Sequence, residues 1–409
     1  MSLLRYGYIA GPLIGALWTW VMAIVACVIM SFSTGEAVAP FSLSALLMGA
    51  WLGFVWLPDG GRAAGARIGM SAALAVVPAL AFVLFQPAIY GPEETRLSTI
   101  ALAWAILGGS AAWPLHLMLR GLPYGAATRH EFEEAVIRFL TGFGYVFFTA
   151  IVVIPFYVMV MTSVKSQAAL LQNPLDFTLD LDRGWAMFRS YSELFDQFNF
   201  GTYMWTSFYV SVLTVLITLL FSVPGAYAVA RLRFRGRAAF SRSILLIYMV
   251  PMIVLALPIY IAFSTTGLRN TILGIVLIYP VTTIPVALYM LQGYFRGLPG
   301  EVEEAGLMDG LTRIAVIWKI TLPLSLPALA SVSLYVFMIA WNEFLLAFML
   351  LDDPSKFTLT RGVASLNSSE IPREHLMAGA VVSTVPVMAL FLGLERFMTK
   401  GLTAGSVKG

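Results

Sequence analysis

Charged residues are scarce in this chain of 409 residues, since Asp, Glu, Lys and Arg together make up 11% of it. Soluble proteins carry roughly 25% charged residues, whereas here hydrophobic residues reach 59% of the chain. The single cysteine excludes a disulfide framework and a thiolate zinc site, and the three scattered histidines form no metal cluster. This composition predicts an all-α polytopic membrane protein without a metal site.

A nucleotide-binding loop is also missing from the sequence. P-loops end in Gly-Lys followed by Ser or Thr, and no Gly-Lys pair occurs anywhere in this chain. The longest hydrophilic connection, 165–202, is shorter than the roughly 40 residues that a chain usually needs to fold alone. An ATP-driven activity would therefore need separate ATPase subunits that bind ATP and Mg²⁺, and solute capture outside the membrane would need a separate binding protein.

Ten apolar segments are each long enough to cross about 30 Å of hydrocarbon as a helix. We predict these spans at 8–32, 41–57, 69–90, 98–119, 139–163, 204–230, 243–264, 271–295, 328–351 and 376–397. We further divide the chain into a four-helix N-terminal extension with its linker, a six-helix core and a tail. These parts cover residues 1–138, 139–397 and 398–409.

Basic residues fall on one side of the predicted membrane, and cytoplasmic loops carry such an excess of Lys and Arg. They are Arg5, Arg62, Arg67, Arg120, Arg129, Arg138, Arg231, Arg233, Arg235, Arg237, Arg242, Lys400 and Lys408. The connection 165–202, on the other side, carries more acidic than basic residues. This pattern predicts that both termini lie in the cytoplasm.

One predicted cytoplasmic loop, 296–323, breaks this charge rule. Its acidic residues outnumber its basic residues, and they are Glu301, Glu303, Glu304 and Asp309 against Arg296, Arg313 and Lys319. Pro299 suits the start of a short helix, and Asp309-Gly310 suits a turn with positive φ. We therefore predict two short helices that meet at a corner, with the second running from about Thr312 to Pro323. An ordinary amphipathic connector would explain these features alone equally well.

The spacing within this loop follows a known pattern. The pattern reads Glu-Ala-Ala, three residues, Gly, nine residues, Ile, one residue and Leu-Pro, and it is matched by Glu304, Ala305, Gly310, Ile320, Leu322 and Pro323. The loop thus resembles the cytoplasmic signature loop of ABC importer permeases. Gly306 stands where the second alanine is usual, at a cost of about 1 kcal/mol in helix stability.

The resemblance extends from about residue 139 to the end of the chain. Trp341-Asn342-Glu343-Phe344 and the tail 401–409 are similar to the second permease subunit of the maltose-type, carbohydrate-uptake importers. The resemblance implies an inner-membrane assembly of two permeases, an ATPase dimer and a solute-binding protein. It also implies that the loop couples this chain to the ATPase, through Glu303, Glu304, Ala305, Asp309, Gly310, Ile320, Leu322 and Pro323.

Polar residues inside the predicted spans are candidates for the substrate path, because such groups usually face protein or water. We name Asn342, Glu343, Thr282 and Thr283, since amide, hydroxyl and carboxylate groups bind sugar hydroxyls well. Hydrogen bonding between helices would explain each of these residues equally well.

Two other functional classes remain open from the sequence. An ion- or proton-coupled secondary carrier would also have many spans, but its halves usually repeat, and no similarity between halves is evident here. A membrane enzyme would need an acid pair, a histidine cluster or an activated nucleophile, and we assign no catalytic residue. Nothing in the sequence indicates a nucleic-acid partner.

Overall fold

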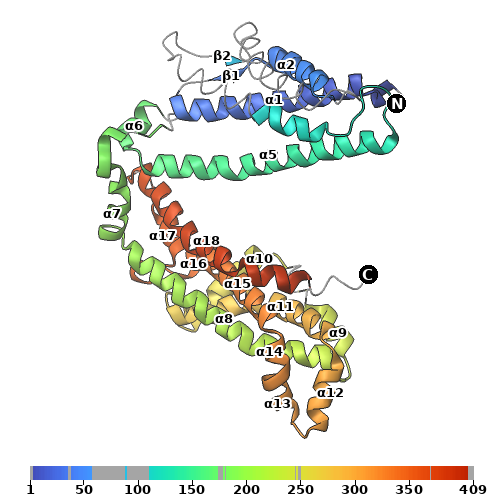
Figure 1. Cartoon of the computed structure of the whole chain (residues 1–409). Helices are drawn as coiled ribbons and strands as arrows, with labels where there is room; N and C mark the ends of the chain where they lie inside the picture. The colour runs from blue at the N-terminus through green and yellow to red at the C-terminus, as the bar shows by residue number, and fades with distance from the viewer. Residues whose placement is uncertain are drawn as a thin grey trace. The chain divides into compact units, whose positions relative to one another are not determined.

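The computed structural model in Figure 1 divides into two compact units, Met1–Met187 and Phe188–Gly409, which we describe separately. It describes residues 3–35, 38–57, 88–89, 110–173, 178–179, 181–244, 246, 250–368 and 370–403. Of the predicted span 69–90 only Ala88–Ile89 is described, and most of the predicted span 98–119 and the last residues of the tail lie outside the described residues.

The first unit is built around the long helix α1. Its elements are η1 (Leu3–Arg5), α1 (Gly7–Thr34), β1 (Ala39–Pro40), α2 (Ser42–Val55), β2 (Ala88–Ile89), α5 (Arg129–Ser163) and α6 (Gln167–Gln172). The two short strands pair antiparallel, with Ala39 opposite Ile89. Residues 110–118 are also helical, and their buried side chains join one apolar core with α1, α2 and the start of α5.

Helices α1 and α2 approach each other closely because each carries two glycines four residues apart. A Cβ added to Gly15 would lie 2.2 Å from the carbonyl oxygen of Gly49, and one added to Gly53 would lie 2.1 Å from that of Gly11. Small residues with this spacing let helix backbones pack closely within a membrane. Any larger residue at these four positions would push the two helices apart.

The segment 120–138, predicted as a linker, contains the first turns of α5. The Thr128 side chain accepts a hydrogen bond from the Glu131 N–H at 3.3 Å, and the Glu131 carboxylate accepts one from the Thr128 N–H at 2.8 Å. This reciprocal capping box fixes the start of the helix. The predicted domain boundary at residue 138 therefore falls within one continuous helix.

The second unit contains most of the helices. They are α7 (Arg189–Asp196), α8 (Phe200–Arg231), α9 (Arg237–Ser243), α10 (Met252–Thr265), α11 (Ile272–Gly297), α12 (Gly300–Met308), α13 (Arg313–Val316), the π-helical segment η4 (Ile317–Thr321), α14 (Leu322–Leu324), α15 (Leu326–Asn342), α16 (Leu345–Leu350), α17 (Leu359–Ser365) and α18 (Arg373–Thr403). The 3-10 segments η2 (Leu181–Phe188) and η5 (Pro354–Lys356) precede α7 and α17.

Helices α8 and α11 pack side by side in this unit (Figure 1). The hydroxyl groups of Thr218 and Thr283 share a hydrogen bond of 2.6 Å between the two helices, and the Ser222 hydroxyl donates to the carbonyl oxygen of Ile284 at 3.3 Å. Helix α15 packs against both α8 and α18. The hydrogen bonds between α8 and α11 help to hold these helices together, since side-chain bonds of this type join helices within a membrane.

Five described helices are long and apolar enough to span a membrane, and a sixth results if the bent pair Arg313–Leu324 and Leu326–Asn342 counts as one span. The helical membrane fold is thus confirmed, while the count of ten spans is not. Helices α2 and α10, at the predicted spans 41–57 and 243–264, have 14 residues each. They are about 21 Å long at 1.5 Å per residue, which is less than the hydrocarbon thickness of about 30 Å.

The prediction of one uninterrupted span at 328–351 is wrong. The helix stops after Asn342, where Glu343 adopts extended backbone with φ −67° and ψ 123°. The Glu343 carboxylate accepts hydrogen bonds from the backbone N–H groups of Leu346 and Ala347 at 2.8 and 3.1 Å. It thereby satisfies the first free amides of α16, so a new helix starts instead of the old one continuing.

An ionic network joins α7 to the first turn of α18. The Glu193 carboxylate lies 2.6 Å from the Arg189 Nε and 2.7 Å from the His375 Nε2. The hydrogen bonds from Arg189 and from His375 lower the pKa of the Glu193 carboxyl. The ring of Phe198 covers His375, with 5.4 Å between the ring centroids.

Candidate functional site

The loop 296–323 has the predicted shape of two short helices joined at a corner. Helix α12 ends in a Schellman motif, in which the Leu311 N–H donates to the Gly306 carbonyl oxygen and the Gly310 N–H donates to that of Leu307, both at 3.1 Å. This motif needs a left-handed residue, and Gly310 has φ 85°. Thr312 then caps α13, because its side chain accepts a hydrogen bond from the Ala315 N–H.

The second short helix continues through Pro323 and bends at Ser325. Segments Arg313–Leu324 and Leu326–Asn342 differ in direction by 78°. At the bend, the Thr321 carbonyl oxygen accepts hydrogen bonds from both the Ser325 N–H, at 3.0 Å, and the Ser325 hydroxyl, at 2.6 Å. The loop is therefore an angled projection that leads directly into α15.

Glu303 anchors this projection to the end of α8. Its Oε2 accepts a hydrogen bond from the Tyr227 hydroxyl at 3.2 Å, and its Oε1 accepts one from the Thr321 hydroxyl at 3.2 Å. The same Oε1 lies 3.3 Å from the Arg231 Nε, and only 11% of the Glu303 side chain and 17% of the Arg231 side chain are exposed. A largely buried carboxylate requires such partners, so Glu303 holds α12, α8 and η4 together.

Gly306 also faces inward, toward the second short helix. A Cβ at this position would lie 2.5 Å from the Ile320 Cδ1 and 3.5 Å from the Val316 Cγ2. The glycine thus lets α12 lie close to η4. An alanine at this position would require the Ile320 side chain to move. Two of the predicted coupling residues, Glu303 and Ile320, therefore position the loop from inside.

The other face of the loop is exposed and carries large apolar side chains. Met308, Ile314 and Trp318 are 88%, 70% and 69% exposed. Several predicted coupling residues share this exposure, namely Glu304, Ala305, Asp309, Gly310 and Pro323, whereas Leu322 is half-buried. Exposed apolar side chains beside acidic groups are typical of a protein-docking surface.

The four candidates for the substrate path have different hydrogen-bond partners. Thr283 is buried and bonded to α8, and the Thr282 hydroxyl donates to the Tyr279 carbonyl oxygen at 2.7 Å. Asn342 is exposed and its amide donates to the Met338 carbonyl oxygen. Glu343 caps α16. Thr283 thus bonds a neighbouring helix, Thr282 and Asn342 each bond a carbonyl oxygen of their own helix, and Glu343 bonds the amides that follow it.

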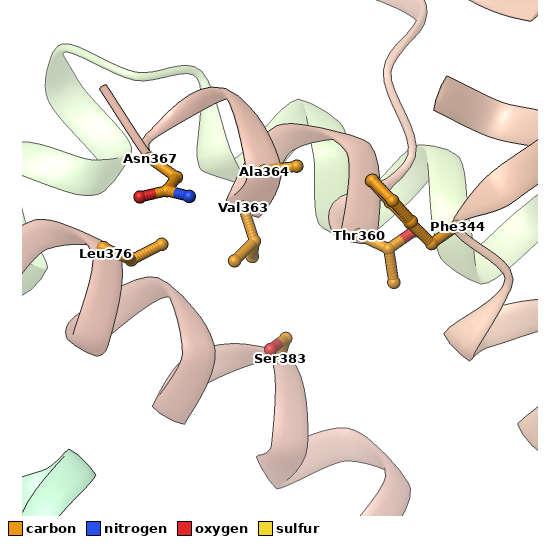
Figure 2. Close-up of a pocket in the computed structure, with 7 residues that line it drawn as sticks. All are labelled: Phe344, Thr360, Val363, Ala364, Asn367, Leu376 and Ser383. Atoms are coloured by element: carbon orange, nitrogen blue, oxygen red, sulfur yellow. The ribbon is translucent and has the colours of Figure 1, made fainter. Parts of the chain in front are cut away.

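A shallow hollow lies beside the helix break at Glu343, between α17 and α18 (Figure 2). Its volume is about 340 Å³, and it is lined by Phe344, Thr360, Val363, Ala364, Asn367, Leu376 and Ser383. Thr360, Val363 and Ala364 lie on one face of α17, and Asn367 follows the end of that helix. The sequence offered no signal for this hollow, because it depends on how α17 lies against α18.

Sequence reasoning also missed the partners of Glu303. Tyr227 and Arg231 lie more than 70 positions before it in the chain, and they become neighbours only when α8 and α12 pack together. The exposed apolar residues Met308, Ile314 and Trp318 could have been found, since they lie on a loop predicted to face water.

Comparison with known proteins decides the class of this chain. Residues 222–403 match the family model described as binding-protein-dependent transport system inner membrane component. The chain is 37% identical to the inner membrane ABC transporter permease protein YcjP of Escherichia coli K12 over 270 residues, which is 65% of this chain and 95% of that protein. The chain belongs to the inner-membrane permeases of binding-protein-dependent ABC transporters.

Other relatives agree with this family. The trehalose/maltose transport system permease protein MalG of Thermococcus litoralis is 33% identical over 280 residues, covering 68% of this chain and 99% of that protein. The fold is similar to a chain in the crystal structure of a bacterial ABC transporter that imports the acidic polysaccharide alginate, with a TM-score of 0.56, 24% identity and coverage of 66% and 98%. The permease class is thus confirmed, and the ion-coupled carrier is not favoured.

Membership of this family also defines the role of the chain. An ABC importer permease is a transport subunit and not an enzyme, and a separate subunit hydrolyses ATP. The apolar helices and the family together indicate a multi-pass protein of the inner membrane.

Proposed function

We propose that this permease subunit imports a sugar or a related polyol or glycoside with energy from ATP. The support comes from its relatives, whose names specify trehalose or maltose and arabinooligosaccharides as transported solutes. The assembly would contain a second permease, an ATPase dimer that binds ATP and Mg²⁺, and a solute-binding protein outside the membrane. The distribution of basic residues supports a cytoplasmic position for both termini.

The loop 296–323 is the proposed contact with the ATPase. Its exposed face, with Met308, Ile314 and Trp318 beside Glu304 and Asp309, would bind the ATPase surface. Its inner face, held by Glu303, would transmit the movement of the ATPase to α8 and α15. Packed helices change position as bodies, because close-packed interfaces switch between discrete arrangements.

Replacement of Gly310 tests this role. Proline fixes φ near −65°, so Gly310→Pro cannot keep the turn at φ 85° and would redirect α13 relative to α12. We expect this variant to insert in the membrane, to lose uptake and to hydrolyse ATP without transport. Gly310→Asn is the matched control, because asparagine tolerates left-handed backbone better than other residues with a side chain, and it should retain most of the uptake.

Uptake and hydrolysis are best measured in vesicles that contain the whole importer and its binding protein. Normal sugar uptake by Gly310→Pro would contradict the coupling role. Loss of uptake in both variants would mean that the backbone turn is not the decisive feature. A panel of radiolabelled disaccharides, tested with the unaltered importer, addresses the substrate class, and failure to transport any sugar would contradict it.

The polar residues near the helix break are a weaker part of the proposal. Asn342 is exposed on α15, and its amide can still accept or donate bonds beyond the one that it makes. We assign Asn342 and Glu343 to the path of the solute, while Thr282 and Thr283 are proposed only as its flank. Substitution of Asn342 by Ala should raise the KM for uptake if this assignment is right.

A further inference from the structure

A run of arginines follows the inner end of α8. Arg231 closes that helix, an extended stretch follows, and Gly236 with φ 87° turns the chain into α9. Two of these arginines, Arg231 and Arg237, bind other parts of the protein through their side chains. Arg231 binds Glu303 and the Leu298 carbonyl oxygen, and Arg237 donates to two carbonyl oxygens near the end of α8, at 2.7 and 2.9 Å.

The three other arginines of this run have a different environment. Arg233, Arg235 and Arg242 are exposed. Among the residues that the structure describes, none of the three forms an ion pair or a hydrogen bond. The nearby Arg296 does have a partner, because its guanidinium donates to the Ser241 hydroxyl at 3.3 Å. Three of the six arginines in this region thus bind the rest of the fold, and within the described part of the chain Arg233, Arg235 and Arg242 do not.

Aromatic side chains lie between the unpaired arginines. Phe234 and Phe240 are 44% and 50% exposed, although neither belongs to a membrane-spanning helix. Helix α9 is fixed on its other face, where the Ser241 hydroxyl donates to the Gln292 Oε1 of α11 at 3.0 Å. The exposed face of α9 and the stretch before it thus combine cations with aromatic rings at the end of a 32-residue apolar helix.

We infer that Arg233, Arg235 and Arg242 bind the headgroups of anionic phospholipids, with Phe234 and Phe240 lying among the adjoining acyl chains. A guanidinium can bind phosphate through two parallel hydrogen bonds. Basic residues next to a membrane-spanning helix are attracted to anionic lipids, and exposed aromatic residues favour the same interface. An acidic protein surface would match the charges but would not explain the exposed Phe234 and Phe240 side chains between them.

The lipid contact would sit beside the coupling loop. Arg231 belongs to both regions, since it ends α8 and binds Glu303 of α12. Lipid bound to the neighbouring arginines would therefore lie next to the segment proposed to receive the ATPase. The inference concerns lipid binding alone, and it does not depend on which solute is transported.

Native mass spectrometry of the detergent-solubilised importer can test this inference, with phosphatidylglycerol and phosphatidylcholine as probes. Each arginine near an anionic surface contributes roughly a five-fold gain in affinity, so Arg233→Gln with Arg235→Gln should weaken phosphatidylglycerol binding by about 30-fold. Replacement of both by Lys should retain most of the binding. The control exchanges Arg129 and Arg189 for Gln, which removes the same charge from two arginines already paired with glutamates.

Specific loss of phosphatidylglycerol from the first variant, with phosphatidylcholine binding unchanged, would support the inference. Equal losses from the first variant and from the control would contradict it, as would equal binding of the two lipids by the unaltered protein. If the first variant keeps its phosphatidylglycerol but releases the ATPase, these arginines contact an acidic protein surface and the lipid assignment is wrong.

Discussion

Removal of the Glu303 carboxylate should both destabilise the protein and release the loop 296–323, the proposed contact with the ATPase, from the end of α8. In Glu303→Ala, the Tyr227 and Thr321 hydroxyls lose their acceptor, and Arg231 keeps only the Leu298 carbonyl oxygen as a partner. Breaking a buried ion pair costs about 3–5 kcal/mol. Because both side chains retain slight exposure, we expect a loss of about 3 kcal/mol for Ala and about half of that for Gln, which can still accept the hydroxyl bonds.

Thermal unfolding of the solubilised importer would measure this loss. For a unit of the size of Phe188–Gly409, a loss of about 3 kcal/mol should lower the unfolding midpoint by roughly 6–12 °C. The number of solute molecules carried per ATP should fall as well, because α12 is no longer fixed to α8. Ala at the neighbouring exposed Glu304 is the control, and it should leave the midpoint unchanged.

A double-mutant cycle with Arg231→Met isolates the ion pair. Residues in direct contact show interaction energies of about 0.5–3 kcal/mol, whereas independent residues have additive effects. The double variant should therefore lose less than the sum of the two single losses. Strict additivity, or a Glu303→Ala protein with unchanged midpoint and unchanged coupling, would refute the anchoring role of Glu303.

Three further changes probe other contacts. In Gly306→Ala, the new Cβ meets the movable Ile320 Cδ1, which opposes a gain of about 1 kcal/mol in helix stability. Ile320→Val should therefore cost less stability in Gly306→Ala than in the unaltered protein; equal costs would mean that the two side chains do not clash. Glu343→Ala should cost about 1–2 kcal/mol through the lost cap of α16, and it should raise the KM for uptake because Glu343 is assigned to the path of the solute; an unchanged KM would mean that the residue is only structural. Because the pKa of the Glu193 carboxyl is lowered in the folded protein, the ionised carboxylate should stabilise the fold above about pH 4. This contribution should be lost as the pH falls through the lowered pKa of the folded protein. If Glu193→Gln and the unaltered protein show the same dependence of unfolding midpoint on pH, this reasoning is wrong.

Much of the helical architecture can be predicted from composition and periodicity. The predicted span 204–230 falls within α8, and the predicted span 271–295 begins one residue before α11 and otherwise falls within it, because the length of an apolar run indicates such helices. The corner of the coupling loop was also predictable, since Gly310 is required for a left-handed turn. These features depend on a few neighbouring residues, which the sequence displays directly.

Features that depend on distant partners were not predictable. The run 328–351 is apolar enough for one helix, and the break at Glu343 arises because its carboxylate satisfies the backbone amides that follow. The predicted coupling residues separate into an inner and an outer set only when α12 packs against α8 and η4. Sequence spacing identifies such residues as a group, but their orientation is a property of the packed structure.

Helix α8 connects the loop 296–323 with α17, because it contacts both. At 1.5 Å per residue, its 32 residues extend about 48 Å. One end is joined to the coupling loop by Tyr227 and Arg231, and toward the other end the Ser207 hydroxyl accepts a hydrogen bond from the Leu359 N–H of α17 at 2.7 Å. A tilt imposed at the loop 296–323 would therefore reach the helices beside the hollow of Figure 2 along this one helix, which contains Pro224.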